Sequence, residues 1–364
     1  MNRILVTAAI YATALFQITM AQVPGEICNW DGDKKAAIVL TFDDWSPGQY
    51  PIATPELQSR NITATFFIVV RNVSNWKNVQ TVVSNGNEVG NHTYSHPYLN
   101  RLNKWVGTPP IPPYKDFTAE WKAEIPEAKN LFEQNLPATS IISFAYPMGA
   151  AAIINNETDQ QIQDAVVYSG HICARGVTAP IDFSYQFARK QQDYYNLTTY
   201  SMSSSVNLNE FANQIQQTIK GGGLLTFLYH SLDNGSYYND SWYNQVQQSE
   251  FNKQLDTLVS FRDKVWITTL GQAIKYHKEK NCASLTELQA FNGKKWILSL
   301  TDTLAEDSIY NQPLTLKINT KGIKYKKIFQ NGTELPIDAI VNDSILFRAI
   351  PDRGKIILIA GDSK

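Results

Sequence analysis

Short apolar runs alternate along much of the chain with segments in which apolar residues recur every three or four positions. The short runs predict buried strands, and the longer spacing predicts helices. We expect strands at residues 36–42, 64–70, 87–92, 140–147, 168–177, 184–190, 224–230 and 265–270. We expect helices at residues 54–61, 76–86, 117–135, 207–223, 246–264 and 270–281, with Pro126 kinking or splitting the third. Strands that alternate with helices predict parallel βα units, and seven or eight such units predict a βα barrel of the α/β class.

The pattern changes after residue 282, where the helical spacing ends. Short apolar strands, separated by Asn-Gly, Asp and Pro turns, are expected at residues 294–300, 314–320, 324–330, 344–350 and 355–360. Such turns join neighbouring antiparallel strands. The sequence therefore predicts a barrel domain at residues 22–283 and a small, sandwich-like all-β module at residues 284–364.

The first residues have the composition of a secretory signal peptide. Arg3 precedes an apolar run that ends in Thr19, Met20 and Ala21, a pattern that predicts cleavage after Ala21. The run is short for a membrane span, and an uncleaved anchor is the alternative. We expect residues 1–21 to be removed and the mature chain, which has no second long apolar run, to be secreted, extracellular or periplasmic.

Composition excludes some classes of partner. The net charge is -1 and the isoelectric point is about 6.5, so neither a nucleic acid nor an anionic membrane surface is an expected partner. Aromatic residues make up 12% of the chain, which is typical of a large core and also of a groove that stacks on sugar rings. We expect a monomer.

The chain has three cysteines, which is compatible with export and a disulfide. Cys28 lies before the first strong strand and Cys282 after the last helix, and a closed barrel would bring these two points together. We therefore expect a disulfide between them. Cys173 lies in an apolar run and is interpreted as a buried free thiol.

Residues able to bind a metal or transfer a proton follow several of the predicted strands. Asp43 and Asp44 follow the first, His92 and His96 the third, and His230 a later one. In a parallel barrel, reacting groups lie at these carboxyl ends of strands. Two histidines four residues apart, with one carboxylate, predict a site for Zn²⁺ or for another first-row ion such as Co²⁺ or Ni²⁺. The second carboxylate is then a candidate general base, and His230 a candidate general acid.

The two remaining histidines receive no role. His277 lies in "KYHKEK", which predicts a solvated helix face. His171 begins a predicted strand and has no evident partner.

The segments "TFDD", "HTYSH", "FAYPMG" and "LYH" resemble the motifs of the polysaccharide deacetylases, the NodB-homology family or carbohydrate esterase family 4. The resemblance covers roughly residues 30–280. It implies a distorted (β/α)7 barrel and metal-dependent removal of an acetyl group from an N- or O-acetylated sugar. It also implies a role for each of these residues: Asp43 as base, Asp44, His92 and His96 as metal ligands, His230 as acid, and Leu228 as the apolar wall near the acetyl methyl.

The third motif departs from the family pattern. Many members have an arginine there that braces the base, and an aromatic residue where this chain has Met148. The backbone N–H of Met148 can still bind a developing oxyanion, since that role needs no side chain. The bracing cation must come from elsewhere, and we favour Arg189, with Arg175 as the alternative. The rings that are candidates for contact with a sugar are Trp45, Tyr50, Tyr146, Tyr237 and Trp242.

Together with these patterns, the resemblance implies a secreted, metal-dependent deacetylase of a polysaccharide or oligosaccharide, with an N-acetylglucosamine-type glycan as the favoured substrate and partner. One alternative is a catalytically weak carbohydrate-binding protein of the cell surface, in which the C-terminal module binds the glycan. Two further alternatives use the same scaffold: an O-acetyl esterase of the xylan type, and a hydrolase of a non-sugar amide.

Overall fold

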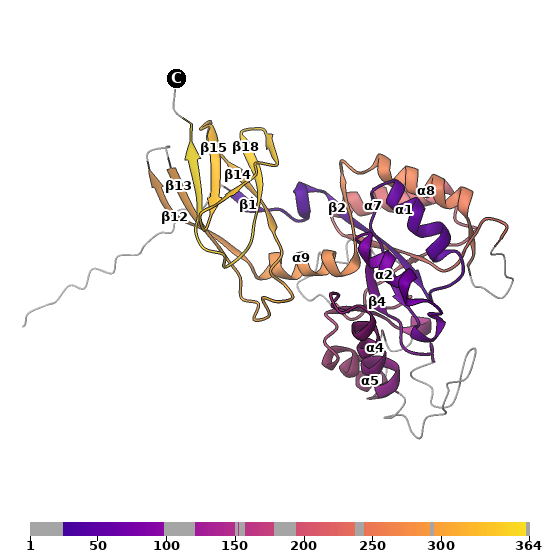
Figure 1. The fold of residues 1–364 in the computed structure, drawn as a ribbon. Coiled ribbons are helices and arrows are strands. Elements are labelled where there is room, and N and C mark those ends of the chain that lie inside the picture. Colours follow the sequence, from indigo (N-terminus) through magenta and orange to yellow (C-terminus); the bar gives the residue numbers. More distant parts are fainter. Residues whose placement is uncertain are drawn as a thin grey trace, which may run out of the picture.

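The computed structural model describes residues 25–97, 121–149, 152, 157–177, 194–236, 244–291 and 295–361. They form one lobe with helices around a sheet and a second lobe of strands, and helix α9 (Leu270–Cys282) lies between the two (Figure 1). The predicted signal peptide and the predicted strand at residues 184–190 lie outside the described residues.

A curled parallel sheet forms the centre of the first lobe. Its strands follow the order β6-β5-β4-β3-β2-β8-β7, and β11 also pairs with β2. All eight residues of β2 are buried, as its unbroken apolar run predicts. The bounds are β2 Ala36–Asp43, β3 Thr65–Ile68, β4 Glu88–Asn91, β5 Ser143–Ala145, β6 Cys173–Arg175, β7 Tyr200–Ser201, β8 Leu224–Tyr229 and β11 Val265–Thr268, beside the parallel pair β9 Leu232–Asp233 and β10 Val246–Gln247.

The two ends of this sheet are joined by the chain that leads into β7. The N–H of Leu197 donates to the carbonyl of Ala174, and its own carbonyl accepts from the N–H of Gly176, both at 3.0 Å. Tyr200 and Ser201 pair with β8 on the other side. The sheet therefore closes on itself, and the distorted (β/α)7 barrel implied by the motifs is confirmed.

Helices connect the strands, and one of them is missed by the sequence pattern. The pattern predicts a strand at residues 168–177, but Tyr168 ends helix α5 and the strand is only β6. Ile162, Ala165 and Val166 are buried at helical spacing, so the signal for α5 is present but short. The bounds are α1 Thr54–Ser59, α2 Trp76–Ser84, α4 Ala128–Asn135, α5 Glu157–Tyr168, α7 Leu208–Gly221 and α8 Gln248–Ser260, with short helices η1 Asp31–Asp33, η3 Val70–Asn72 and η5 Pro147–Gly149.

Pro126 does alter the predicted helix at residues 117–135. The segment Ala123–Glu127 is a π-helix, η4, which runs into α4. A proline inside a helix removes an N–H donor and crowds the preceding carbonyls, and a single π-turn accommodates such a defect. A second π-helix, η2 (Gln49–Ala53), precedes α1 and also contains a proline.

The second lobe consists of two antiparallel sheets, which confirms the all-β character of the C-terminal part. Trp296, Leu298 and Leu300 alternate with exposed or half-buried residues along β13, as expected for a strand with one face on a core. β1 pairs with β14, so Gly25–Ile27 lies with these strands, and the division of the chain at residue 283 stays a prediction. The sheets have the orders β1-β14-β18-β17 and β12-β13-β19-β15-β16, with bounds β1 Gly25–Ile27, β12 Ser284–Phe291, β13 Lys295–Thr301, β14 Leu314–Asn319, β15 Tyr325–Gln330, β16 Thr333–Leu335, β17 Ala339–Val341, β18 Ser344–Ala349 and β19 Ile356–Ala360.

Cys28 and Cys282 are free thiols, so the expected disulfide between them is not formed. The backbone of Cys28 is fixed on the second lobe, because its N–H donates to the carbonyl of Thr315 at 2.8 Å. Burial raises the pKa of the Cys28 thiol to about 12, which makes it unreactive. Cys173 is a buried free thiol, as predicted.

Both histidines without a predicted role are buried, and both predictions about their surroundings are wrong. His277 is 4% exposed, its ring centroid lies 5.7 Å from that of Trp30, and its Nδ1 is 3.0 Å from the Tyr194 hydroxyl. His171 is 1% exposed, and its Nε2 lies 3.3 Å from Nδ2 of Asn91. Burial lowers the pKa of each to about 3, so both rings are neutral at pH 7.

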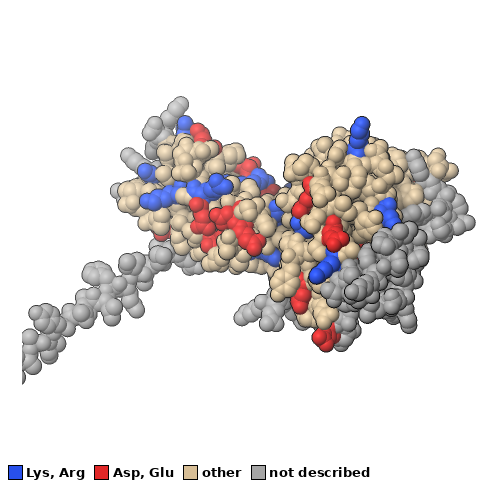
Figure 2. All heavy atoms as spheres, turned by 60° about the horizontal axis from the view of Figure 1, so that its bottom comes forward, with Lys and Arg blue, Asp and Glu red and all other residues tan. Residues whose placement is uncertain are grey.

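Among the residues described, no helix is both long enough and apolar enough to cross a bilayer. Lysine and arginine side chains are interspersed with acidic ones on the face shown in Figure 2. In the strand-rich lobe, for example, Nε of Arg348 lies 2.6 Å from Oδ1 of Asp31. A mixed surface of this kind produces no large field of one sign on that face.

Candidate active site

The end of β2 brings two adjacent carboxylates to one place. Asp43 is the last residue of the strand, and the backbone is then left-handed at Asp44 (φ 77°) and Trp45 (φ 61°). Residues other than glycine keep this conformation where the surrounding structure enforces it. Here the Asp44 N–H donates to the carbonyl of Phe67 at 3.0 Å, and Nδ2 of Asn72 donates to the carbonyl of Asp44 at 2.7 Å. Because the chain turns here, the two carboxylates do not point to opposite faces as they would within a strand.

The two histidines of the HTYSH segment lie in the loop after β4. Nδ1 of His92 is 2.8 Å from the carbonyl oxygen of Ala145, a contact that favours a proton on Nδ1 and leaves Nε2 facing the carboxylates. The ring centroids of His92 and His96 are 4.8 Å apart. The loop is left-handed at Thr93 (φ 70°) and at His96 (φ 60°), and this tight turn brings the second ring back towards the first.

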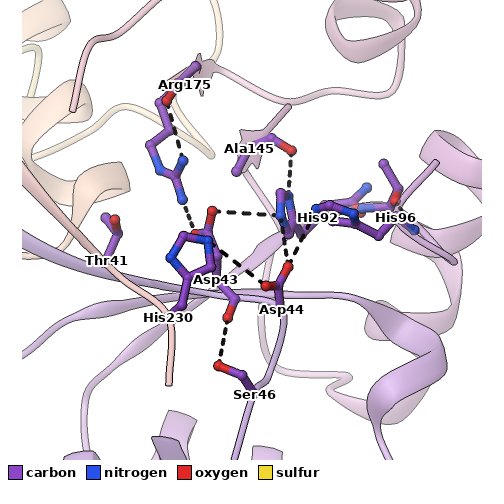
Figure 3. Close-up of polar contacts among 12 residues, drawn as sticks. Thr41, Asp43, Asp44, Ser46, His92, His96, Ala145, Arg175 and His230 are labelled. Carbon is purple, nitrogen blue, oxygen red and sulfur yellow. Dashed lines mark hydrogen bonds and ion pairs between the residues drawn. The ribbon is translucent and has the colours of Figure 1, made fainter. Parts of the chain in front are cut away.

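The described part of the structure brings together three side chains that can bind a metal ion, those of Asp44, His92 and His96. Their ligand atoms all lie within 4.8 Å of one another (Figure 3). Nε2 of His92 lies 3.3 Å and Nε2 of His96 lies 3.5 Å from Oδ1 of Asp44. That oxygen is buried and accepts no hydrogen bond. Burial alone would raise the pKa of Asp44, but the neighbouring imidazoles of His92, His96 and His230 hold it well below its usual range. Burial lowers the pKa of His96 to about 4.

Arg175, at the end of β6, contacts the carboxylate of Asp43 through its guanidinium (Figure 3). Arg175 is fully buried, and its guanidinium lies 4.7 Å from the centroid of the Phe67 ring. Burial lowers its pKa to about 9, so the group stays charged at pH 7. Ala145 in β5 lies in the motif from which the family's arginine is missing, and it pairs in register with Arg175 in β6. The cation therefore reaches Asp43 from the strand next to that motif. Arg189, the favoured candidate for this contact, lies outside the described residues.

His230 follows β8, and its Nε2 lies 3.9 Å from Oδ2 of Asp44. Burial lowers the pKa of His230 to about 4. Gln49 in η2 links this residue to the base, because its Nε2 donates to the backbone carbonyls of Asp43 at 2.5 Å and of His230 at 2.9 Å. The sequence offered no signal for Gln49, since a single glutamine before a short helix has no distinctive pattern.

The residues predicted to touch a substrate differ in exposure. Met148 is 51% exposed and follows the buried end of β5. Trp45 is half-buried, with its ring centroid 6.3 Å from that of Tyr50. Tyr146 is fully buried and Leu228 is 1% exposed, so neither side chain is open to a ligand as the structure stands. The stacking candidates outside the described residues are Tyr237 and Trp242.

Residues 31–168 match the family model described as polysaccharide deacetylase. This match supports the resemblance to the polysaccharide deacetylases over that part of the chain. The matched deacetylase segment contains the aspartate pair and the histidine pair of the site, whereas Arg175 and His230 lie beyond it.

Curated relatives match this chain over part of their own length. The chain is 22% identical over 363 residues to a gellan lyase of a Bacillus species, which is 92% of this chain and 13% of that protein. It is 39% identical over 72 residues to a peptidoglycan-N-acetylglucosamine deacetylase of Bacillus cereus, which is 19% of this chain and 26% of that protein. The chain therefore spans less than a third of the length of the curated relatives it matches. A solved peptidoglycan N-acetylglucosamine deacetylase aligns at 18% identity with a TM-score of 0.40, over 66% of this chain and 88% of that one.

Proposed function

We propose that this protein is a metal-dependent deacetylase of an acetylated polysaccharide or oligosaccharide. The observation that carries the proposal is the buried Oδ1 of Asp44, which accepts no hydrogen bond and lies between the Nε2 atoms of His92 and His96. A buried, unsatisfied acceptor is costly, and a divalent cation would satisfy it. Two imidazoles and one carboxylate favour Zn²⁺, with Co²⁺ or Ni²⁺ as alternatives.

When bound, such an ion would polarise the acetyl carbonyl and lower the pKa of water from about 15.7 towards 7. Asp43 would accept the proton of the attacking water. Since Arg175 contacts Oδ1 of Asp43, the carboxylate is fixed in orientation and Oδ2 is the oxygen left for this proton. The Met148 N–H would donate to the developing oxyanion. His230 would protonate the departing nitrogen or oxygen.

Two relatives support a substrate class. A peptidoglycan-N-acetylglucosamine deacetylase and a chitooligosaccharide deacetylase are each 39% identical to this chain, over 72 and 70 residues. We therefore propose an N-acetylglucosamine-type glycan as substrate, with export directed by residues 1–21. The alternative of a binding protein without turnover depends on the missing arginine, and the contact of Arg175 with Asp43 supports an enzyme instead.

Free acetate measured with a panel of chitin oligosaccharides, peptidoglycan fragments and acetylated xylan tests the proposal. We expect release from the N-acetylated glycans, loss of release after chelation, and recovery on addition of Zn²⁺ or Co²⁺. Asp43→Asn should abolish release while leaving Zn²⁺ binding intact. Activity that survives exhaustive chelation, or that is unchanged in Asp43→Asn, would contradict the proposal, and release from acetylated xylan alone would favour the esterase.

A further inference from the structure

We propose that Glu124 is a positioning residue for His96 and thereby sets the affinity of the site for its metal ion. The inference rests on the proposed function and concerns a residue outside the four motifs. Glu124 lies in η4 and is fully buried. Its carboxylate faces the loop that carries His92 and His96.

Both carboxylate oxygens of Glu124 accept a hydrogen bond from Ser95. The Ser95 N–H donates to Oε2 at 2.7 Å, and the Ser95 hydroxyl donates to Oε1 at 2.6 Å. Ser95 is 2% exposed, so water does not compete for these bonds. Hydrogen bonds to a charged acceptor are roughly twice as strong as neutral ones. Because Ser95 directly precedes His96, the carboxylate fixes the residue next to the one from which the second imidazole projects.

The loop needs anchoring because its backbone conformation is unfavourable. Thr93, a β-branched residue, and His96 both have φ in the left-handed region, at 70° and 60°. The Thr93 N–H donates to Oδ1 of Asn91 at 2.8 Å, and the His96 N–H donates to Oγ1 of Thr93 at 3.0 Å. These bonds close the turn locally, and Glu124 ties the closed turn to the neighbouring helix.

Backbone carbonyls of η4 also bind the segment that carries the two histidines. The carbonyl of Glu124 accepts from the N–H of Tyr94 at 3.1 Å, and the carbonyl of Ile125 accepts from Nδ2 of Asn91 at 3.0 Å. The carbonyls of Glu124 and Ile125 and the carboxylate of Glu124 therefore all bind the segment at residues 91–95. Turns of π-helix are frequent at functional sites.

The two histidines depend on the loop to different degrees. The carbonyl of Ala145 contacts the His92 ring directly at 2.8 Å, and that side chain is 2% exposed. The His96 side chain is 26% exposed, so packing constrains it less and its position follows the backbone of the loop. Groups that orient a metal ligand typically change metal affinity by about 10- to 100-fold when removed.

Glu88 provides a matched control. Its carboxylate also accepts from a serine hydroxyl, that of Ser143 at 2.7 Å, and from a backbone N–H, that of Gly271 at 2.7 Å, and in addition from the hydroxyl of Thr65 at 2.9 Å. Glu88 begins β4 whereas His92 follows the end of that strand, roughly 13 Å away at about 3.3 Å per residue. Glu88→Ala therefore removes the same kinds of hydrogen bond without touching the histidine loop.

The test is calorimetric titration of the metal-free protein with Zn²⁺, with the absorption spectrum of added Co²⁺ as a probe of ligand geometry and thermal unfolding of the metal-free forms. We expect Glu124→Ala to weaken Zn²⁺ binding by about 10- to 100-fold and to alter the Co²⁺ spectrum. Glu124→Gln should recover most of the affinity, because its amide can accept from the Ser95 N–H and donate to the Ser95 hydroxyl. Glu88→Ala should lower the melting temperature and leave the Zn²⁺ affinity unchanged.

Ser95→Ala removes one of the two hydrogen bonds and is the milder variant to use if Glu124→Ala does not fold. It should also weaken Zn²⁺ binding, by less than Glu124→Ala does. Wild-type affinity and spectrum in Ser95→Ala and in any folded Glu124→Ala would overturn the inference and leave the proposed function standing. An equal loss of affinity in Glu88→Ala would also overturn it, since affinity would then follow general stability. A wild-type protein that binds neither Zn²⁺ nor Co²⁺ would refute both proposals together.

Discussion

Removal of the Arg175 guanidinium is expected to reduce both stability and activity. In Arg175→Met an apolar side chain occupies the same buried space, but Asp43 loses its cation. Breaking a buried ion pair by removing one partner costs about 3–5 kcal/mol. The Arg175 guanidinium also lies 4.7 Å from the centroid of the Phe67 ring, and a cation–π contact of this kind contributes about 0.5–2 kcal/mol. We therefore expect the free energy of unfolding, measured by denaturant titration, to fall by about 3.5–7 kcal/mol.

Arg175→Met is also expected to slow catalysis, because Arg175 orients Asp43, the proposed base. A displacement of about 1 Å in a reacting group can cost about 100-fold in rate, so we expect kcat/KM for acetate release to fall on the order of 100-fold. Arg175 contacts Asp43 rather than the carboxylate of Asp44, so Zn²⁺ affinity should change little.

A second variant separates this explanation from a general loss of stability. Arg175 and Ala145 are register partners on adjacent strands, so their side chains project from the same face of the sheet. In the double variant Ala145→Arg, Arg175→Ala the cation projects from the neighbouring strand. Its kcat/KM should be about tenfold or more higher than that of Arg175→Ala alone. Wild-type kcat/KM in Arg175→Met, or a double variant no more active than Arg175→Ala, would refute the reasoning.

Three further predictions concern stability. Burial, with the charges of neighbouring acidic groups, raises the pKa of Glu279 to about 8 from an ordinary 4.5, so the contribution of Glu279 to the free energy of unfolding should be complete below about pH 4.5 and slope downwards as the pH rises to about 8. Glu279→Gln should flatten that slope in denaturant titrations, and an unchanged slope would contradict the assignment. Gly48 has φ 84° and an added Cβ would collide with the carbonyl of Leu232, so Gly48→Ala should cost about 2 kcal/mol or more. Gly222→Ala should cost about 1 kcal/mol, because Gly222 has φ 75° but an added Cβ would make only an ordinary contact, at 3.8 Å from the carbonyl oxygen of Lys35. Equal costs would argue against the collision. A reducing agent should leave the melting temperature unchanged because the thiols are free, and a lowered melting temperature would show that a disulfide forms.

Much of the barrel could be predicted because its strands and helices depend on local patterns. The apolar run at residues 36–42 becomes β2, the helical spacing at residues 76–86 becomes α2, and the proline in the helix predicted at residues 117–135 marks a real break. The errors concern one missed helix, α5, and the burial and pairing of side chains. His277 was expected in solvent because the residues around it are charged, but its side chain packs against Trp30, which lies far away in the sequence.

By itself the sequence determined that two aspartates and two histidines lie at the carboxyl ends of two parallel strands, because each pair follows a recognisable strand. Only the tertiary structure decided which cation reaches Asp43 and which groups hold the loop of His96. Arg175 is 132 residues from Asp43 and Glu124 is 29 residues from Ser95. Contacts over such separations depend on the lateral order of the strands and on the face that a helix turns inward. Packing sets both, and no local pattern of residues encodes them.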